Sequence, residues 1–256
     1  MQKQTFQKNI LILLNHVDSL AICQAGIARY CEKVKERTDG EFLIVPTYKD
    51  VSNIQFSVQT GTNSEGQNVV FVNPDEIRAL IPPALAVHNA CLLFDPDMVS
   101  GSALPTNPSD NGDVFQIPKS WIGNIPGWNG SQYSAQYFFG HENSHADFWR
   151  AGVPDKTHNP NPHTTLGPEV DPSDFYIDLL LELKPYWAKL GDVMYTTKFV
   201  KIKGTGEYGV VEITPHTKIY HPALDGADLI NMAKKFNLDI ISNGQINFAL
   251  AEEITL

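Results

Sequence analysis

The sequence contains the motif His-Glu-x-x-His at residues 141–145. If this stretch is a helix, His141 and His145 lie one turn apart on the same face and direct both imidazoles at one point, as ligands of a Zn²⁺ ion do. Glu142 is then rotated by about 100° from His141, close enough to reach a water bound to such an ion. The metal acidifies that water and the carboxylate takes its proton, so the motif predicts metal-dependent hydrolysis with Glu142 as the general base.

The residues around the motif favour a helix. Residues 132–150 contain no proline and a single glycine, Gly140, and Gly152 stands where a helix C-cap glycine belongs. By the helical period, four aromatic residues lie within about 80° of the histidine pair: Tyr137, Phe138, Phe148 and Trp149. The alternative is two core histidines with a chance carboxylate between them. It is less favourable, because such polar groups are costly to bury for packing alone.

Composition limits the class of protein. With 256 residues, of which 42% are apolar, the chain is long enough for one domain of ordinary size and a small one. The net charge of −10 argues against nucleic acid and anionic membranes as partners. No apolar stretch is long enough to span a membrane, and Ile10–Leu14 is too short for the core of a signal peptide. We therefore expect a soluble protein, either not exported by that route or secreted with its signal removed before this numbering.

The predicted elements place the motif helix after a set of strands. Apolar runs predict strands at 9–14, 41–48, 69–72, 90–94 and 114–117, and the last has the alternation of a sheet edge. Apolar spacing predicts helices from Asp18 or Ser19 to Arg37, at 74–80 and at 173–190, with Pro185 late in the last one. Polar segments at 59–68, 95–113 and 153–172 are expected to be loops. The fold class expected is α+β, with a mixed sheet and an edge strand.

Composition changes near Gly191. Strands are predicted at 198–203, 209–214, 218–220 and 246–250, with one helix at 227–236. We therefore expect a main domain at residues 1–190 and a small C-terminal β-rich α/β module at 191–256. The run Phe199–Gly204 resembles the start of a strand–strand–helix module appended to bacterial surface and phage proteins, which implies an attachment or binding role.

The predicted elements follow the order helix, several strands, edge strand and His-Glu-x-x-His helix. This order resembles that of the zincin metallopeptidases over about residues 9–190. The resemblance implies a zincin-like domain, zinc as the cofactor, and a peptide or protein substrate. In that fold an extended substrate pairs with the edge strand, here residues 114–117, by ordinary β-augmentation.

A catalytic zinc normally has three protein ligands and one open position. The metzincin pattern would place Gly and His where this chain has Phe148 and Ala151, so that subfamily is excluded. The thermolysin-like pattern takes a carboxylate from a later helix. The candidates are Glu169, Asp174, Asp178 and Glu182, and none lies in the expected local motif.

The segment after the helix is most similar to the aspzincins, the deuterolysin-like peptidases, whose signature continues Gly-Thr-x-Asp-x-x-Tyr-Gly. Residues 152–159 of this chain read Gly-Val-Pro-Asp-Lys-Thr-His-Asn, so the Gly and the Asp coincide and the other signature residues differ. The resemblance implies that Asp155 joins His141 and His145 as a metal ligand, and that His158 stabilises the oxyanion in place of the Tyr. His158, His163 and Glu169 remain alternatives for the third ligand.

The function predicted is therefore a zinc-dependent metallopeptidase. Two alternatives remain. A hydrolase of cell-wall peptides, held on its substrate by the C-terminal module, would cleave peptidoglycan fragments and act little on casein. A non-catalytic zincin-like binding or virion-structural protein would carry no zinc, or zinc without turnover. The other histidines are expected to be structural or on the surface: His16, His88, His216 and His221.

Overall fold

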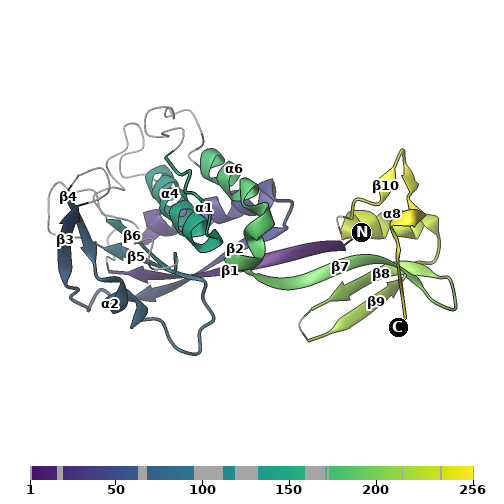
Figure 1. Cartoon of the computed structure of the whole chain (residues 1–256), viewed down its shortest axis with the longest axis horizontal. Coiled ribbons are helices and arrows are strands. Elements are labelled where there is room, and N and C mark those ends of the chain that lie inside the picture. Colours follow the sequence, from purple (N-terminus) through teal and green to yellow (C-terminus); the bar gives the residue numbers. More distant parts are fainter. Residues whose placement is uncertain are drawn as a thin grey trace. The chain divides into compact units, whose positions relative to one another are not determined.

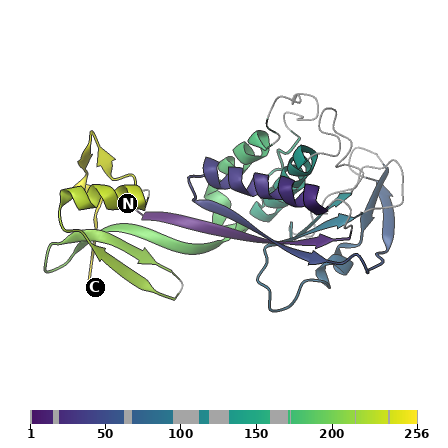
Figure 2. The same cartoon turned by 180° about the vertical axis from the view of Figure 1, so that it is seen from behind.

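The computed structural model describes residues 2–15, 20–62, 68–94, 112–118, 132–158, 171, 173–214, 216–236 and 238–255, and these form helices and a mixed β-sheet (Figures 1 and 2). The chain divides into two compact units. One comprises residues 8–38 and 43–191 and carries the motif. The other comprises residues 1–7, 39–42 and 192–256. It thus includes two short N-terminal segments that the division expected at residue 191 assigns to the main domain.

The strands of the motif-bearing unit form a largely parallel sheet. Residues Ile10–Leu14 of β1 (Gln2–Leu14) pair in parallel with β5 (Asn89–Phe94), and β5 pairs in parallel with β6 (Val114–Pro118). The strand β2 (Phe42–Asp50) pairs with β1. In the described part of the chain β6 is the last strand at its side of the sheet, so the edge strand predicted at 114–117 is confirmed.

Three helices lie together over one face of this sheet: α1 (Leu20–Arg37), α4 (Gln132–Ala151) and α6 (Asp174–Glu182) (Figure 1). Phe115 of β6 points toward α4, where its ring lies 5.8 Å from that of Phe139. Gly140 lets the neighbouring helices approach α4 closely. A Cβ atom there would lie 2.8 Å from the Tyr30 ring of α1 and 3.0 Å from the Tyr176 ring of α6.

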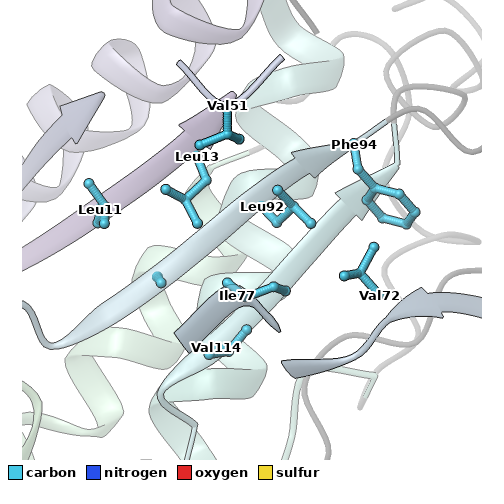
Figure 3. Packing of buried hydrophobic residues seen from close by; sticks show 9 residues of the cluster. Leu11, Leu13, Val51, Val72, Ile77, Leu92, Phe94 and Val114 are labelled. Carbon is cyan, nitrogen blue, oxygen red and sulfur yellow. The ribbon is translucent and has the colours of Figure 1, made fainter. Parts of the chain in front are cut away.

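The opposite face of the sheet is buried by a second layer. Figure 3 shows the apolar side chains of β1, β5 and β6 gathered there against Val51, Val72 and Ile77. Ile77 belongs to α2 (Pro74–Arg78), and Val72 to a hairpin of β3 (Val58–Thr62) and β4 (Asn68–Val72). The loop predicted at 59–68 is therefore wrong for Gln59–Thr62. The register pairs these polar residues with the apolar β4, which overrides their weak strand pattern.

The end of the motif helix is set by a glycine, as predicted. Gly152 has a φ of 74°, and its N–H donates to Trp149 O at 3.1 Å. The next N–H, from Val153, donates back to Phe148 O at 3.2 Å, which completes a Schellman cap. The helix predicted at 173–190 ends earlier, at Glu182. The ring of Pro185 cannot continue it, and the chain passes through a short 3₁₀ turn (Lys184–Tyr186) into α7 (Trp187–Leu190).

The other unit is built on a three-stranded antiparallel meander of β7 (Asp192–Ile202), β8 (Tyr208–Ile213) and β9 (Lys218–Pro222). Gln2–Gln7 of β1 and β12 (Glu252–Ile254) pair along β7. The helix α8 (Gly226–Lys235) packs its Leu229 and Ala233 against Phe199 and Val210. The strand predicted at 246–250 is wrong. A two-residue hairpin strand β11 (Gln245–Ile246), paired with β10 (Ile241–Ser242), is followed by a 3₁₀ turn (Phe248–Leu250).

No helix in the described ranges is long and apolar enough to cross a membrane.

Candidate metal centre

The two histidines of the motif lie on α4 and are almost fully buried, with 4% and 6% of their surfaces exposed. Their Nε2 atoms are 3.2 Å apart, and their rings meet edge to face with centroids at 4.7 Å. The ring of Tyr137 stacks on that of His141 with the centroids 6.1 Å apart, and the ring of Trp149 stacks on that of His145 with the centroids 5.7 Å apart. Two of the four aromatic residues expected on this face of the helix, Tyr137 and Trp149, therefore pack against the imidazoles.

A third imidazole joins them from the segment that follows the helix. His158 places its Nε2 atom 3.3 Å from Nε2 of His141, and its ring centroid lies 4.9 Å from that of His145. One ligand nitrogen from each of the three residues lies within 4.8 Å of the others. His158 is exposed, so the group is reached from the surface although the motif histidines are buried.

The distances from Nε2 of His141 to the other two nitrogens fit a tetrahedral metal ion. With Zn–N bonds of about 2.0–2.1 Å, two ligands of a tetrahedral site lie about 3.3–3.4 Å apart. The two separations that involve Nε2 of His141, 3.2 and 3.3 Å, match that value, and the three ligand nitrogens all lie within 4.8 Å of one another. Imidazole nitrogen is also a preferred ligand type for zinc and for several neighbouring transition metals.

The partners of the two Nδ1 atoms explain why the Nε2 atoms of His141 and His145 face one another. Nδ1 of His145 lies 2.5 Å from Oδ2 of Asp155, and a carboxylate can only accept. Nδ1 of His141 lies 2.9 Å from the Tyr176 hydroxyl, which can donate its own proton to Tyr137. When both Nδ1 atoms carry protons, both neutral rings turn lone pairs toward each other, and a cation between them removes the repulsion.

Asp155 therefore stands behind His145 instead of beside the other ligand atoms. Its second oxygen, Oδ1, accepts from the Thr157 N–H at 2.8 Å. Partial burial alone would raise the pKa of this carboxyl, but the hydrogen bonds from His145 and Thr157 outweigh it and lower the pKa. The structure thus brings His158, and not Asp155, into the group of converging nitrogens.

Glu142 is completely buried, and its Oε1 lies 3.7 Å from Nε2 of His141. Within the described ranges, neither of its oxygens has a hydrogen-bond partner. Burial, and then the charge of Asp155, raise the pKa of this carboxyl well above its ordinary value. Burying a carboxylate without a partner is expensive. A cation held by the adjacent imidazoles would offset that cost.

The other carboxylates that could have supplied the third ligand either form ion pairs with basic side chains or lie outside the described residues. Asp174 binds Lys33 and Arg37, Asp178 binds Arg37, and Glu182 binds Lys156. His163 and Glu169 lie outside the described residues, as does His16. Among the remaining histidines, His88 is buried and accepts from Asn9 N–H at 2.9 Å, His216 is exposed, and His221 pairs with Glu212.

The supporting residue Tyr176 was not predicted from the sequence. Tyr176 lies on a different helix from His141, and its position in an apolar run suggests packing alone.

Neither a scan against protein-family models nor a search of curated proteins finds a match for this chain.

Proposed function

We propose that the chain is a zinc-dependent metallopeptidase in which His141, His145 and His158 hold the metal. The observation that carries this proposal is the convergence of the His145 and His158 Nε2 atoms on Nε2 of His141, at 3.2 and 3.3 Å, beside a fully buried Glu142 that has no hydrogen-bond partner among the described residues. Three imidazoles leave the fourth position of a tetrahedral ion open, as catalytic zinc requires. This ligand set differs from the one implied by the aspzincin resemblance, because Asp155 exchanges its role with His158.

Zinc bound by these residues would supply a Lewis acid and lower the pKa of a water molecule to about 7. The protein groups then have separate tasks. Glu142 lies next to the ligand atoms on the same helix and acts as the general base that takes the proton. Asp155 and Tyr176 fix the tautomer and orientation of the two buried imidazoles through their Nδ1 atoms.

The neighbouring sheet supports a peptide as the substrate class. The motif helix packs on β6, and β6 is the terminal strand of the sheet in the described residues. A strand at the edge of a sheet can add an extended peptide by backbone hydrogen bonds, although residues 114–117 of β6 are themselves buried. A motif helix over a mixed sheet that ends in such a strand is compatible with a zincin-like fold. We therefore include the zincin-like fold in the proposal.

The test combines metal analysis with turnover. We expect purified protein to carry about one zinc per chain and to cleave a mixed library of quenched fluorescent peptides. Glu142→Gln should keep the zinc and lose on the order of 10²-fold or more in turnover, because the amide cannot accept a proton. His216→Ala, which changes an exposed histidine of the other unit, should alter neither quantity.

Three results would count against this function. If protein purified without chelators contains no metal, the proposed metal site is wrong. Zinc bound with no cleavage of peptides or casein would favour a binding protein. Cleavage confined to peptidoglycan fragments would narrow the substrate to cell-wall peptides.

A further inference from the structure

A second group of reactive side chains lies buried between β1 and the motif helix. Asn143 and Asp147 are one helical turn apart on α4, and Lys8 of β1 reaches both of them. Lys8 Nζ donates to Oδ1 of Asn143 at 2.7 Å and contacts Oδ1 of Asp147. The other carboxylate oxygen of Asp147 accepts from Nδ2 of Asn143 at 3.0 Å. The three side chains thus form a closed triangle of hydrogen bonds.

This triangle is isolated from water. Lys8 and Asn143 have no exposed surface, and Asp147 has 1%. Lysine is almost never fully buried, and a buried ion pair is weak evidence for stability because both ions must be desolvated. Burial lowers the pKa of the Lys8 ammonium, although the charge of Asp147 opposes the shift. A lysine amine in such a setting is a recognised nucleophile.

The carboxamide of Asn143 lies within reach of that nucleophile. With a C=O bond of about 1.23 Å, the Cγ atom can be no more than about 3.9 Å from Nζ of Lys8. Reacting atoms in a near-attack arrangement lie about 3–3.5 Å apart. We propose that Lys8 and Asn143 become joined by an intramolecular isopeptide bond, with Asp147 as the group that moves the protons.

The reaction balances without an outside reagent. Asp147 takes one proton from the Lys8 ammonium through Oδ1, and the free amine attacks Cγ of Asn143. The Asp147 carboxyl gives a proton to Nδ2 through its other oxygen, the Cγ–Nδ2 bond breaks and ammonia leaves. The attacking nitrogen returns its surplus proton to Asp147. One N–C bond forms, one breaks, and nothing is oxidised or reduced.

The product would tie β1 covalently to the helix that carries His141, Glu142 and His145. A cross-link between residues this distant in sequence removes much of the freedom of the unfolded chain. The inference does not depend on the proposed peptidase function, because none of the three side chains belongs to the converging histidine group.

The test is the mass of the denatured wild-type protein. We expect it to be about 17 Da below the value calculated from the sequence, the mass of one ammonia. Tryptic digestion should yield a branched peptide joining residues 4–29 to residues 120–150, since trypsin does not cleave after an acylated lysine. Lys8→Met and Asp147→Asn should both show the full calculated mass.

Each other outcome would overturn a stated part of the proposal. Full mass for the wild type, both freshly purified and after prolonged incubation, would mean that the triangle is only an ion pair. A deficit that persists in Lys8→Met would assign the loss of ammonia to another site. A cross-link that forms normally in Asp147→Asn would remove Asp147 from the proton transfer. The wild-type measurement stands even where a variant fails to fold.

Discussion

Replacing His158 and Asp155 separately distinguishes a residue that binds the metal from one that orients a ligand. In the structure His158 contributes a nitrogen 3.3 Å from Nε2 of His141, whereas Asp155 contacts the far nitrogen of His145, Nδ1. We therefore expect His158→Ala to weaken zinc binding more than Asp155→Ala. The aspzincin resemblance predicts the opposite order, with Asp155 as the ligand.

The size of each effect depends on the role of the residue that is replaced. Structural zinc sites with four protein ligands bind with about 10–16 kcal/mol, so one ligand accounts for roughly 2.5–4 kcal/mol. Since about 1.4 kcal/mol is a factor of ten, His158→Ala should weaken binding by about 10²–10³-fold. Loss of a residue that orients a ligand typically costs about 10–100-fold, which is the range expected for Asp155→Ala.

Competition with a chromogenic zinc chelator measures both affinities in the same buffer. His216→Ala provides the matched histidine control, because His216 is exposed and lies in the other unit. Equal losses of zinc affinity in His158→Ala and Asp155→Ala would mean that the positions of the two side chains do not distinguish the metal ligand from the residue that orients a ligand. A larger loss in Asp155→Ala would refute the three-histidine assignment and return Asp155 to the ligand set.

Two further predictions concern the motif helix. Gly140→Ala should destabilise the protein by about 1–3 kcal/mol in urea unfolding, although alanine favours helices, because the new methyl would overlap Tyr30 and Tyr176; unchanged stability would mean that the helices can separate freely. Metal-free Glu142→Gln should unfold at a higher temperature than metal-free wild type at pH 8, by about 2–4 °C for each kcal/mol recovered. The raised pKa of Glu142 means that the folded wild type loses stability as the pH rises through the ordinary carboxyl range toward that raised value. The difference should therefore shrink toward pH 4, and a gap independent of pH would contradict this explanation.

The sequence was sufficient for the motif helix because its signals are local. The histidine spacing, the absence of proline and Gly152 all act within one element, and the structure confirms both the helix and its glycine cap. The edge strand at 114–117 was predictable for the same reason. The polar strand Val58–Thr62 was not, because its partner β4, and not its own composition, determines its conformation.

The third member of the histidine group could not be chosen from the sequence. Asp155 and His158 lie three residues apart on the same segment, and both carry ligand atoms suited to zinc. The choice depends on the path of the chain after Gly152, where Asp155 closes a turn onto the Thr157 N–H and brings His158 forward. Such a turn is compatible with many sequences, and only the three-dimensional path decides which side chain meets the motif histidines.

The pattern of burial along α4 gives a physical reason to regard the site as functional. From Ala135 to Phe148 the helix is buried on every side, so each polar residue on it needs a partner or lowers stability. Asn143 and Asp147 share Lys8, and the Ser144 hydroxyl donates to Gly140 O at 2.8 Å. Of the carboxylates on this helix, Glu142 lacks a hydrogen-bond partner in the described part of the chain, and it lies beside the converging imidazoles. Packing alone would favour a neutral residue there. A carboxylate at this position is understandable if a cation and a proton donor complete its surroundings.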